Sequence, residues 1–205
     1  LTRIFLFSFP LAFVGFFDDL YGIGSFFRFV VQLSTGISIV LSTFQLDDLW
    51  RFGLYFPPAF EIFIYAILVV LILLLYVSVV NFVNFMDGLD GLVSGCMIIY
   101  FATYLIVHPN SWPLCSLFGA LIGFFFFNWS PAKLFMGDVG STFMGSILAG
   151  LLLCSSSPTE FLSFLLLAFP LLGDALICVL LRLSAGHRVF QAHRLHLFQR
   201  IHQAG

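Results

Sequence analysis

Two adjacent carboxylates, Asp18 and Asp19, directly follow an apolar run in the stretch F-V-G-F-F-D-D-L-Y-G, residues 13–22. Neighbouring like charges repel, and each raises the pKa of the other unless a cation or a basic group lies between them. The pair therefore indicates a position for a positive group within an otherwise apolar chain.

A second acidic stretch, N-F-V-N-F-M-D-G-L-D-G-L, covers residues 81–92. Its polar residues recur at every third position: Asn81, Asn84, Asp87 and Asp90. On a helix this spacing predicts one polar stripe that faces a common cavity. Gly88 and Gly91 leave the backbone open to a phosphate or a sugar. The alternative is a polar helix end that lies at the membrane interface. An EF-hand calcium loop is excluded, because the downstream glutamate that it requires is missing.

A third stretch, N-W-S-P-A-K-L-F-M-G-D-V-G-S, places Asp138 between two glycines, with Lys133 five residues upstream. Asp138 is a candidate to join Asp18 or Asp19 on a metal ion. The alternative is a simple turn in which Ser141 caps the next helix.

The tail, A-H-R-L-H-L-F-Q-R-I-H, contains His193 and His196 at i and i+3, with Arg200 four residues further on. Donor and cationic groups on one helical face suit a diphosphate. Two alternatives are zinc ligation by the histidines and a basic amphipathic helix on anionic lipid.

These residues lie between long apolar segments, which must position them. The 205 residues are 61% hydrophobic and 9% charged, with a mean hydropathy of +1.10. The apolar runs do not alternate with polar residues, so the predicted fold is an all-α, polytopic membrane protein and not a barrel. No basic tract suggests a nucleic-acid partner. Seven spans are expected at about 4–17, 26–44, 60–80, 92–107, 114–128, 142–157 and 160–182.

Alternate counting of the connections places 18–25, 81–91, 129–141 and 183–205 on one face. Most of the basic residues lie on that face, so the positive-inside rule predicts that it is cytoplasmic. We expect one membrane domain over residues 1–205, incomplete at both ends. Asp174 lies inside the last span, and functional and structural pairing both remain open for it.

The four motifs occur in this order with apolar spans between them. Together they resemble the polyprenyl-phosphate N-acetylhexosamine-1-phosphate transferases, also called family four glycosyltransferases. The resemblance implies transfer of an N-acetylhexosamine-1-phosphate from a UDP-sugar to undecaprenyl phosphate, with release of UMP. It also implies a Mg²⁺ cofactor, for which Mn²⁺ can substitute, and a place in the bacterial inner membrane. A homodimer is one candidate assembly.

The resemblance also implies roles for the motif residues. Asp18, Asp19, Asp87 and Asp90 correspond to the family's acidic motifs and are the expected catalytic residues. Asp138 corresponds to its metal-binding aspartate, and we expect Asp19 to join it. The expected substrate-binding residues are Asn81, Asn84, Lys133, His193, His196 and Arg200.

Two readings of the acidic pair stay open. In the first, Asp18 takes the proton of the lipid phosphate while Asp19 binds the metal, or the reverse. In the second, both bind metal or substrate, and the lipid phosphate is already deprotonated.

The tail reads His-Arg-Leu-His and not the consecutive histidines of the phospho-N-acetylmuramoyl-pentapeptide transferase branch. We therefore expect the branch that initiates O-antigen or other polysaccharides, with the pentapeptide transferase as the alternative. A transporter or an inactive scaffold is the competing class. A transporter usually carries polar residues at mid-membrane on several helices, with repeat symmetry.

Overall fold

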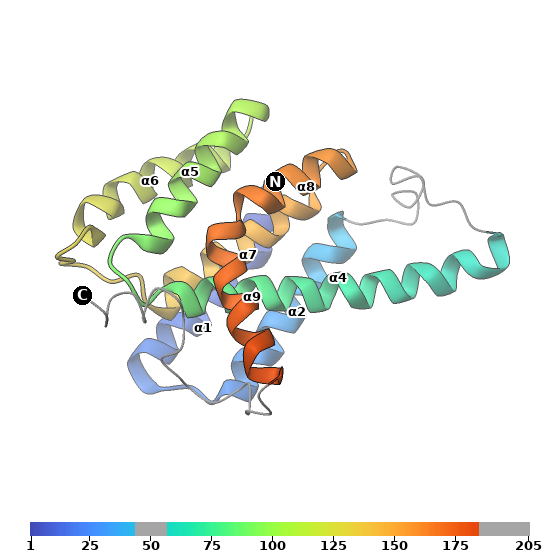
Figure 1. The fold of residues 1–205 in the computed structure, drawn as a ribbon, viewed down its shortest axis with the longest axis horizontal. Coiled ribbons are helices and arrows are strands. Elements are labelled where there is room, and N and C mark those ends of the chain that lie inside the picture. Colours follow the sequence, from blue (N-terminus) through green and yellow to red (C-terminus); the bar gives the residue numbers. More distant parts are fainter. Residues whose placement is uncertain (44–56, 185–205) are drawn as a thin grey trace.

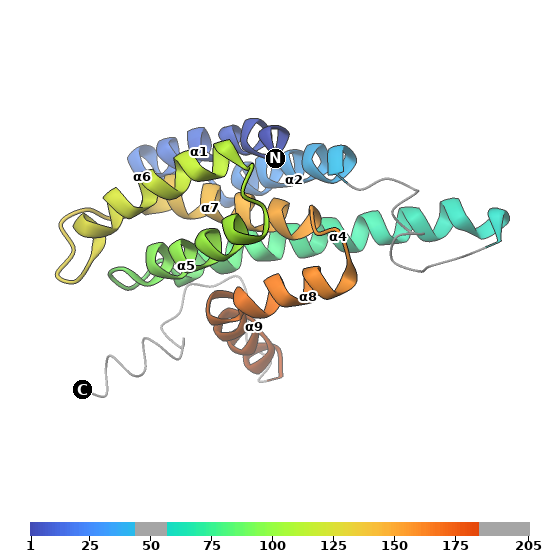
Figure 2. The same cartoon turned by 90° about the horizontal axis from the view of Figure 1, so that it is seen from above.

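A computed structural model of the protein describes residues 1–43 and 57–184, and within them every regular element is an α-helix. The helices are α1 (Thr2–Tyr21), α2 (Ser25–Thr43), α4 (Pro58–Met86), α5 (Leu92–Val107), α6 (Trp112–Asn128), α7 (Gly137–Leu153), α8 (Pro158–Leu167) and α9 (Phe169–Ser184). Figures 1 and 2 show α4 extending beyond its neighbours at its N-terminal end. The predicted all-α class is confirmed.

Several of these helices can cross a membrane. By length and apolar composition, α1, α2 and α4 qualify among the described residues, and α8 with α9 qualifies as a bent pair. The apolar helices α5, α6 and α7 have only 16 or 17 residues. They reach roughly 25 Å at 1.5 Å per residue, slightly less than a hydrocarbon core of about 30 Å. The chain therefore has the character of an integral membrane protein.

The last predicted span, 160–182, does not form one continuous helix, so this prediction is wrong. It is divided into α8 and α9, whose axes meet at 78°. Pro170 lies at the second position of α9. A proline has no N–H to donate, and its ring clashes with the carbonyl four residues earlier, so it ends a helix that would continue through it.

The second acidic stretch is also not one helix. α4 ends at Met86, Asp87 is its C-cap, and α5 begins only at Leu92. Gly91 has a φ of 75°, a left-handed conformation that glycine adopts without strain. The prediction of one stripe of four residues is therefore wrong: Asn81 and Asn84 are helical, and Asp90 lies in the turn.

α7 is the central helix of the bundle. It packs against α1, α2, α4 and α8, and nearly all of its residues from Ser141 to Leu152 are buried. A helix that is apolar on every side is stable only when it is surrounded by other elements. The N-terminus of α7, which carries Asp138, is thus positioned by several neighbours at once.

Three buried hydroxyls connect α1, α7 and α4 within this apolar interior. The hydroxyl oxygen of Ser146 on α7 lies 2.6 Å from that of Ser8 and 2.6 Å from that of Tyr76. Ser8 also donates to the Ile4 carbonyl at 2.8 Å. Because unpaired hydroxyls in an apolar interior are costly, these bonds favour one register of the three helices.

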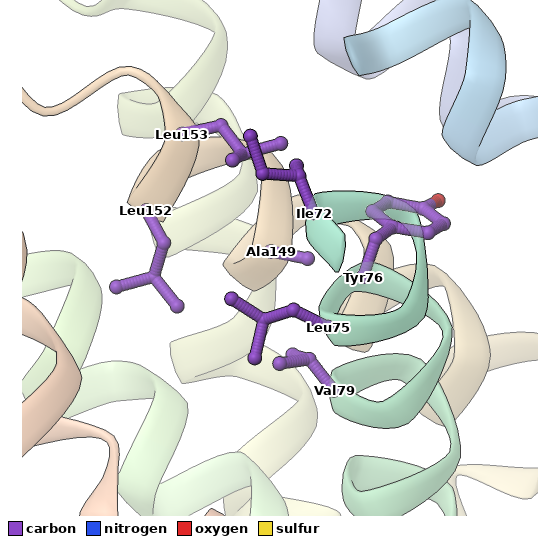
Figure 3. Close-up of a pocket in the computed structure, with 7 residues that line it drawn as sticks. All are labelled: Ile72, Leu75, Tyr76, Val79, Ala149, Leu152 and Leu153. Atoms are coloured by element: carbon purple, nitrogen blue, oxygen red, sulfur yellow. The ribbon is translucent and has the colours of Figure 1, made fainter. Parts of the chain in front are cut away.

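A small apolar cavity lies between α4 and α7, lined by aliphatic side chains and Tyr76. Figure 3 shows the Tyr76 hydroxyl pointing away from the other lining residues. The cavity is a packing defect and offers no polar group to a ligand.

Gly15 allows α1 to approach α7 closely. A Cβ at this position would lie 2.6 Å from the carbonyl carbon and oxygen of Asp138 and from the Cα of Val139. These are backbone atoms, which cannot rotate away as a side chain can. The close approach is what brings the last turn of α1 to the start of α7.

We predict that Gly15→Ala separates α1 from α7. Overpacking of this kind costs about 1–3 kcal/mol, and the thermal midpoint in detergent should fall. Gly119→Ala on α6 is the matched control, since a Cβ there meets nothing within 4 Å. Equal midpoints for the two variants would contradict the predicted role of Gly15.

Candidate active site

The polar end of the bundle begins where α1 stops. Gly22 has a φ of 66°, and its N–H donates to the Asp18 carbonyl at 2.8 Å, which is a typical glycine C-cap. α2 starts at Ser25 after this short turn. Arg28 therefore lies in the first turn of α2, close to the carboxylates that end α1.

Asp19 caps the N-terminus of α7. Its Oδ1 accepts the Asp138 N–H at 3.0 Å, and its Oδ2 accepts the Val139 N–H at 3.1 Å. Gly137, just before them, has a φ of 64°, and a Cβ there would lie 2.5 Å from Asp19 Oδ2. A carboxylate at a helix N-terminus satisfies free N–H groups and interacts favourably with the helix dipole.

Arg28 lies between the other two carboxylates. Its Nη1 donates to Asp18 Oδ2 and to Asp138 Oδ2, both at 2.6 Å. The two acids come from α1 and α7, 120 residues apart in the chain. The positive group that the acidic pair required is, within the described residues, a guanidinium that Asp18 shares with Asp138.

Asn84 of α4 completes the surroundings of Asp138. Its Nδ2 donates to Asp138 Oδ1 at 2.8 Å and to the Ser141 hydroxyl at 2.9 Å. Ser141 donates in turn to the Gly137 carbonyl at 2.8 Å. Ser141 is therefore inside the first turns of α7, and the alternative in which it is the N-cap is wrong.

Asn81 lies one turn before Asn84 and contacts α2. Its Nδ2 donates to Gln32 Oε1 at 3.0 Å and to the Val77 carbonyl at 2.8 Å. Gln32 is buried and lies four residues after Arg28, on the same face of α2. This contact fixes α2 against α4 beside the carboxylates.

Asp87 is half-buried at the C-cap of α4. Burial raises the pKa of its carboxyl to about 7, and the negative charges of Asp138 and Asp19 add to the rise. Asp87 therefore belongs to the same electrostatic cluster as these two acids.

Asp90 and Lys133 do not join the cluster. Asp90 is exposed, and its Oδ2 accepts the Ala132 N–H at 2.9 Å, which ties the 87–91 turn to the 129–136 loop. Buried Asn128 strengthens that connection, because its Oδ1 accepts from Gly91 N–H and the Ser94 hydroxyl. Lys133 is exposed and makes no ion pair within the described ranges.

The remaining predicted site residues, His193, His196 and Arg200, lie outside the described residues. Of the others, the structure brings Asp18, Asp19, Asn84 and Asp138 into direct contact with one another or through Arg28.

Sequence reasoning missed Arg28 and Gln32 as site residues. Arg28 entered only as a basic residue that indicated topology. The available signal was a polar pair at i and i+4 inside an apolar span, which marks a helix face turned toward protein or water and away from lipid.

The oxygen-rich end of the bundle suits a hard divalent cation. No group of three or more His, Cys, Asp or Glu residues is arranged to hold a metal ion within 1–43 and 57–184. Mg²⁺ does not need such a group, because it usually binds one or two carboxylates and completes its shell with water and substrate phosphate. Asp138 with Asp18 or Asp19 meets that requirement.

Comparisons with known proteins place the chain in a family. Residues 1–156 match the family model described as Glycosyl transferase family 4. The phospho-N-acetylmuramoyl-pentapeptide-transferase of Lactobacillus acidophilus is 32% identical over 205 residues, covering 89% of this chain and 61% of the relative. The same-named protein of Lactobacillus helveticus is 32% identical over 197 residues, covering 89% of this chain and 61% of the relative. The same-named protein of Prochlorococcus marinus is 36% identical over 124 residues, covering 51% of this chain and 32% of the relative.

The chain belongs to glycosyl transferase family 4, since the family model matches most of its length. It spans about three fifths of the length of the Lactobacillus relatives. The O-antigen branch is not supported, because these relatives carry the name of the alternative, the pentapeptide transferase. The expectation rested on the histidine spacing of the tail, which lies beyond residues 1–156 of the family match.

The pKa of Asp87 predicts a pH dependence for the metal-free protein. The pKa is raised on folding from 3.8 to about 7, so the folded state binds one more proton than the unfolded state between these values. The contribution of protonated Asp87 to the free energy of unfolding is thus fully present below about pH 4, and it is lost as the pH rises through about 7. Asp87→Asn should abolish this loss, so the variant should gain thermal stability relative to wild type from pH 5 to 8 in a chelator. Parallel pH profiles would contradict the raised pKa.

Proposed function

We propose that the full-length protein containing this chain transfers phospho-N-acetylmuramoyl-pentapeptide from its UDP-linked donor to undecaprenyl phosphate, with release of UMP. The names of the relatives at 32% identity support the choice of donor. The observation that carries the proposal is the convergence of Asp18 and Asp138, from two helices, on one cation position at one end of an apolar bundle.

Phosphoryl transfer depends mainly on positioning and on neutralisation of charge. Asn84 holds the Asp138 carboxylate from one side, and Asp19 holds its backbone from the other. The Asp138 oxygens are therefore directed before any substrate binds. This pre-organisation means that little reorganisation is needed during the reaction.

In this proposal Mg²⁺ is held by Asp138 and Asp18. Both oxygens of Asp19 accept α7 N–H groups, whereas Asp18 and Asp138 already share a cation. Asp19 then acts as a positioning residue. A bound Mg²⁺ would supply charge neutralisation at the donor diphosphate.

The lipid phosphate does not need a base in this arrangement. The second pKa of a phosphate monoester is about 6, so most of it is already doubly ionised at neutral pH. We therefore favour the reading in which the acidic pair binds and positions, and does not remove a proton.

We propose that this polar end faces the cytoplasm of a bacterial cell, with the chain in the inner membrane. Arg28 and Lys133 lie at that end, whereas Arg3 lies at the start of α1, at the other. This distribution follows the positive-inside rule. A cytoplasmic site would give direct access to a UDP-linked donor.

The test is a donor competition with the purified full-length protein and undecaprenyl phosphate. UDP-N-acetylmuramoyl-pentapeptide and UDP-N-acetylglucosamine are supplied separately, each with Mg²⁺ or a chelator. We expect Mg²⁺-dependent UMP release and lipid-linked product from the pentapeptide donor. Asp138→Asn should lose more than about 100-fold in rate, since even groups that only orient a metal ligand contribute 10–100-fold.

Glu61→Gln is the matched control, because it removes a carboxylate in the first turn of α4, at the opposite end from Asp87. Its rate should equal that of wild type. Product from UDP-N-acetylglucosamine alone would return the chain to the polysaccharide branch. No product from either donor by folded protein would favour a scaffold or a transporter.

A further inference from the structure

Arg28 occupies the position that a metal ion shared by Asp18 and Asp138 would need. One guanidinium nitrogen lies 2.6 Å from an oxygen of each carboxylate. Mg²⁺ binds oxygen at about 2.0–2.1 Å. A metal ion held by the same two carboxylate oxygens would therefore have to take the place of the guanidinium.

The side chain of Arg28 is exposed enough to leave. It is 34% exposed, whereas that of Asp18 is 10% exposed and that of Asp138 is 26% exposed. The carboxylates are thus held deeper in the protein than the cation that pairs with them. A long arginine stem can rotate toward water without movement of the helix that carries it.

α2 itself is anchored independently of Arg28. Buried Gln32, one turn further along, accepts a hydrogen bond from Asn81 of α4 at 3.0 Å. Gly36, one turn beyond Gln32, packs against the Tyr76 ring, where an added Cβ would lie 2.6 Å away. These two contacts hold α2 against α4 without involving the Arg28 side chain.

We propose that Arg28 is an exchangeable internal cation. It pairs with Asp18 and Asp138 while the site holds no metal, and it moves to the donor diphosphate when a divalent cation takes its place. The inference rests on the proposed function for its metal and its diphosphate. In this role Arg28 balances charge both before and after the metal ion binds.

The exchange couples metal binding to diphosphate binding. A metal ion that arrives alone must displace the guanidinium into water, where it gains no new partner. A metal ion that arrives with a diphosphate gives the guanidinium a new anion, and the fork of Arg N–H donors suits phosphate oxygens. Metal alone should therefore bind weakly, and a diphosphate should strengthen its binding.

The test measures Mn²⁺ binding to the full-length protein by equilibrium dialysis with detection by electron paramagnetic resonance. Arg28→Gln leaves both carboxylates without their cation, so Mn²⁺ alone should bind at least about tenfold more tightly than to wild type. This estimate follows from the 1–3 pKa units by which a neighbouring opposite charge shifts a carboxylate. UDP should strengthen Mn²⁺ binding to the wild-type protein, and the increase should be much smaller for Arg28→Gln.

Two further variants separate charge from packing. Arg28→Lys keeps the positive charge, and its Mn²⁺ affinity should stay within about twofold of wild type. Arg3→Gln removes a positive charge at the start of the same α1 that ends in Asp18, roughly 22 Å away along the helix. Its Mn²⁺ affinity should equal that of wild type.

Wild-type protein provides a second measurement that does not depend on the folding of a variant. Modification of Arg28 by phenylglyoxal, followed by peptide mass spectrometry, reports how free the guanidinium is. Mn²⁺ alone at saturation should increase the modification relative to chelator, and Mn²⁺ with UDP should decrease it again. Unchanged modification under all three conditions would overturn the exchange.

Two results would separate this inference from the proposed function. Equal Mn²⁺ affinity of wild type and Arg28→Gln, with binding lost in Asp138→Asn, would overturn the exchange and leave the metal site intact. An absence of Asp138-dependent Mn²⁺ binding, with or without UDP, would overturn the exchange and the proposed metal site together. The donor competition would still test the transfer itself.

Discussion

The close approach of α1 to the N-terminus of α7 is the constraint on which the polar end of this protein depends. Gly15 lies against the backbone of Asp138, and Asp19 accepts the N–H groups of Asp138 and Val139. The first contact requires the absence of a side chain, and the second requires a carboxylate one helical turn later. Together they set where the Asp138 carboxylate points.

The apolar interior supports that geometry with few polar groups. Ser8, Ser146 and Tyr76 form hydrogen bonds across α1, α7 and α4. Hydroxyls in a membrane interior need partners, so the three helices have one favourable register. The same three helices carry Asp18 and Asp19, Asp138, and Asn84 with Asp87. These three helices therefore hold the apolar interior and the polar end of the bundle in one arrangement.

The charge balance at that end explains how so many acids can share a small space. Arg28 pairs with two carboxylates and offsets one of their two charges, and the α7 N-terminus stabilises a third carboxylate. The pKa of Asp87 rises to about 7 because burial and the neighbouring negative charges are not fully compensated there. A site with excess negative charge and a displaceable arginine is suited to receive a divalent cation together with a diphosphate.

Composition and apolar segment length determined the all-α membrane class, since long unbroken apolar runs admit only membrane helices. The order of the four motifs indicated the family and the acids at the site. Residue spacing along the chain gave a wrong prediction at two places. At Pro170 a single residue divides the predicted last span into two helices. At Met86 the helix α4 ends, so Asp90 lies in a turn away from the acidic cluster. Only the tertiary structure decided that Arg28 and Gln32 belong to the site. Their partners lie on α1, α4 and α7, and contacts between residues so distant in the chain depend on how helices pack, which spacing along one helix does not reveal.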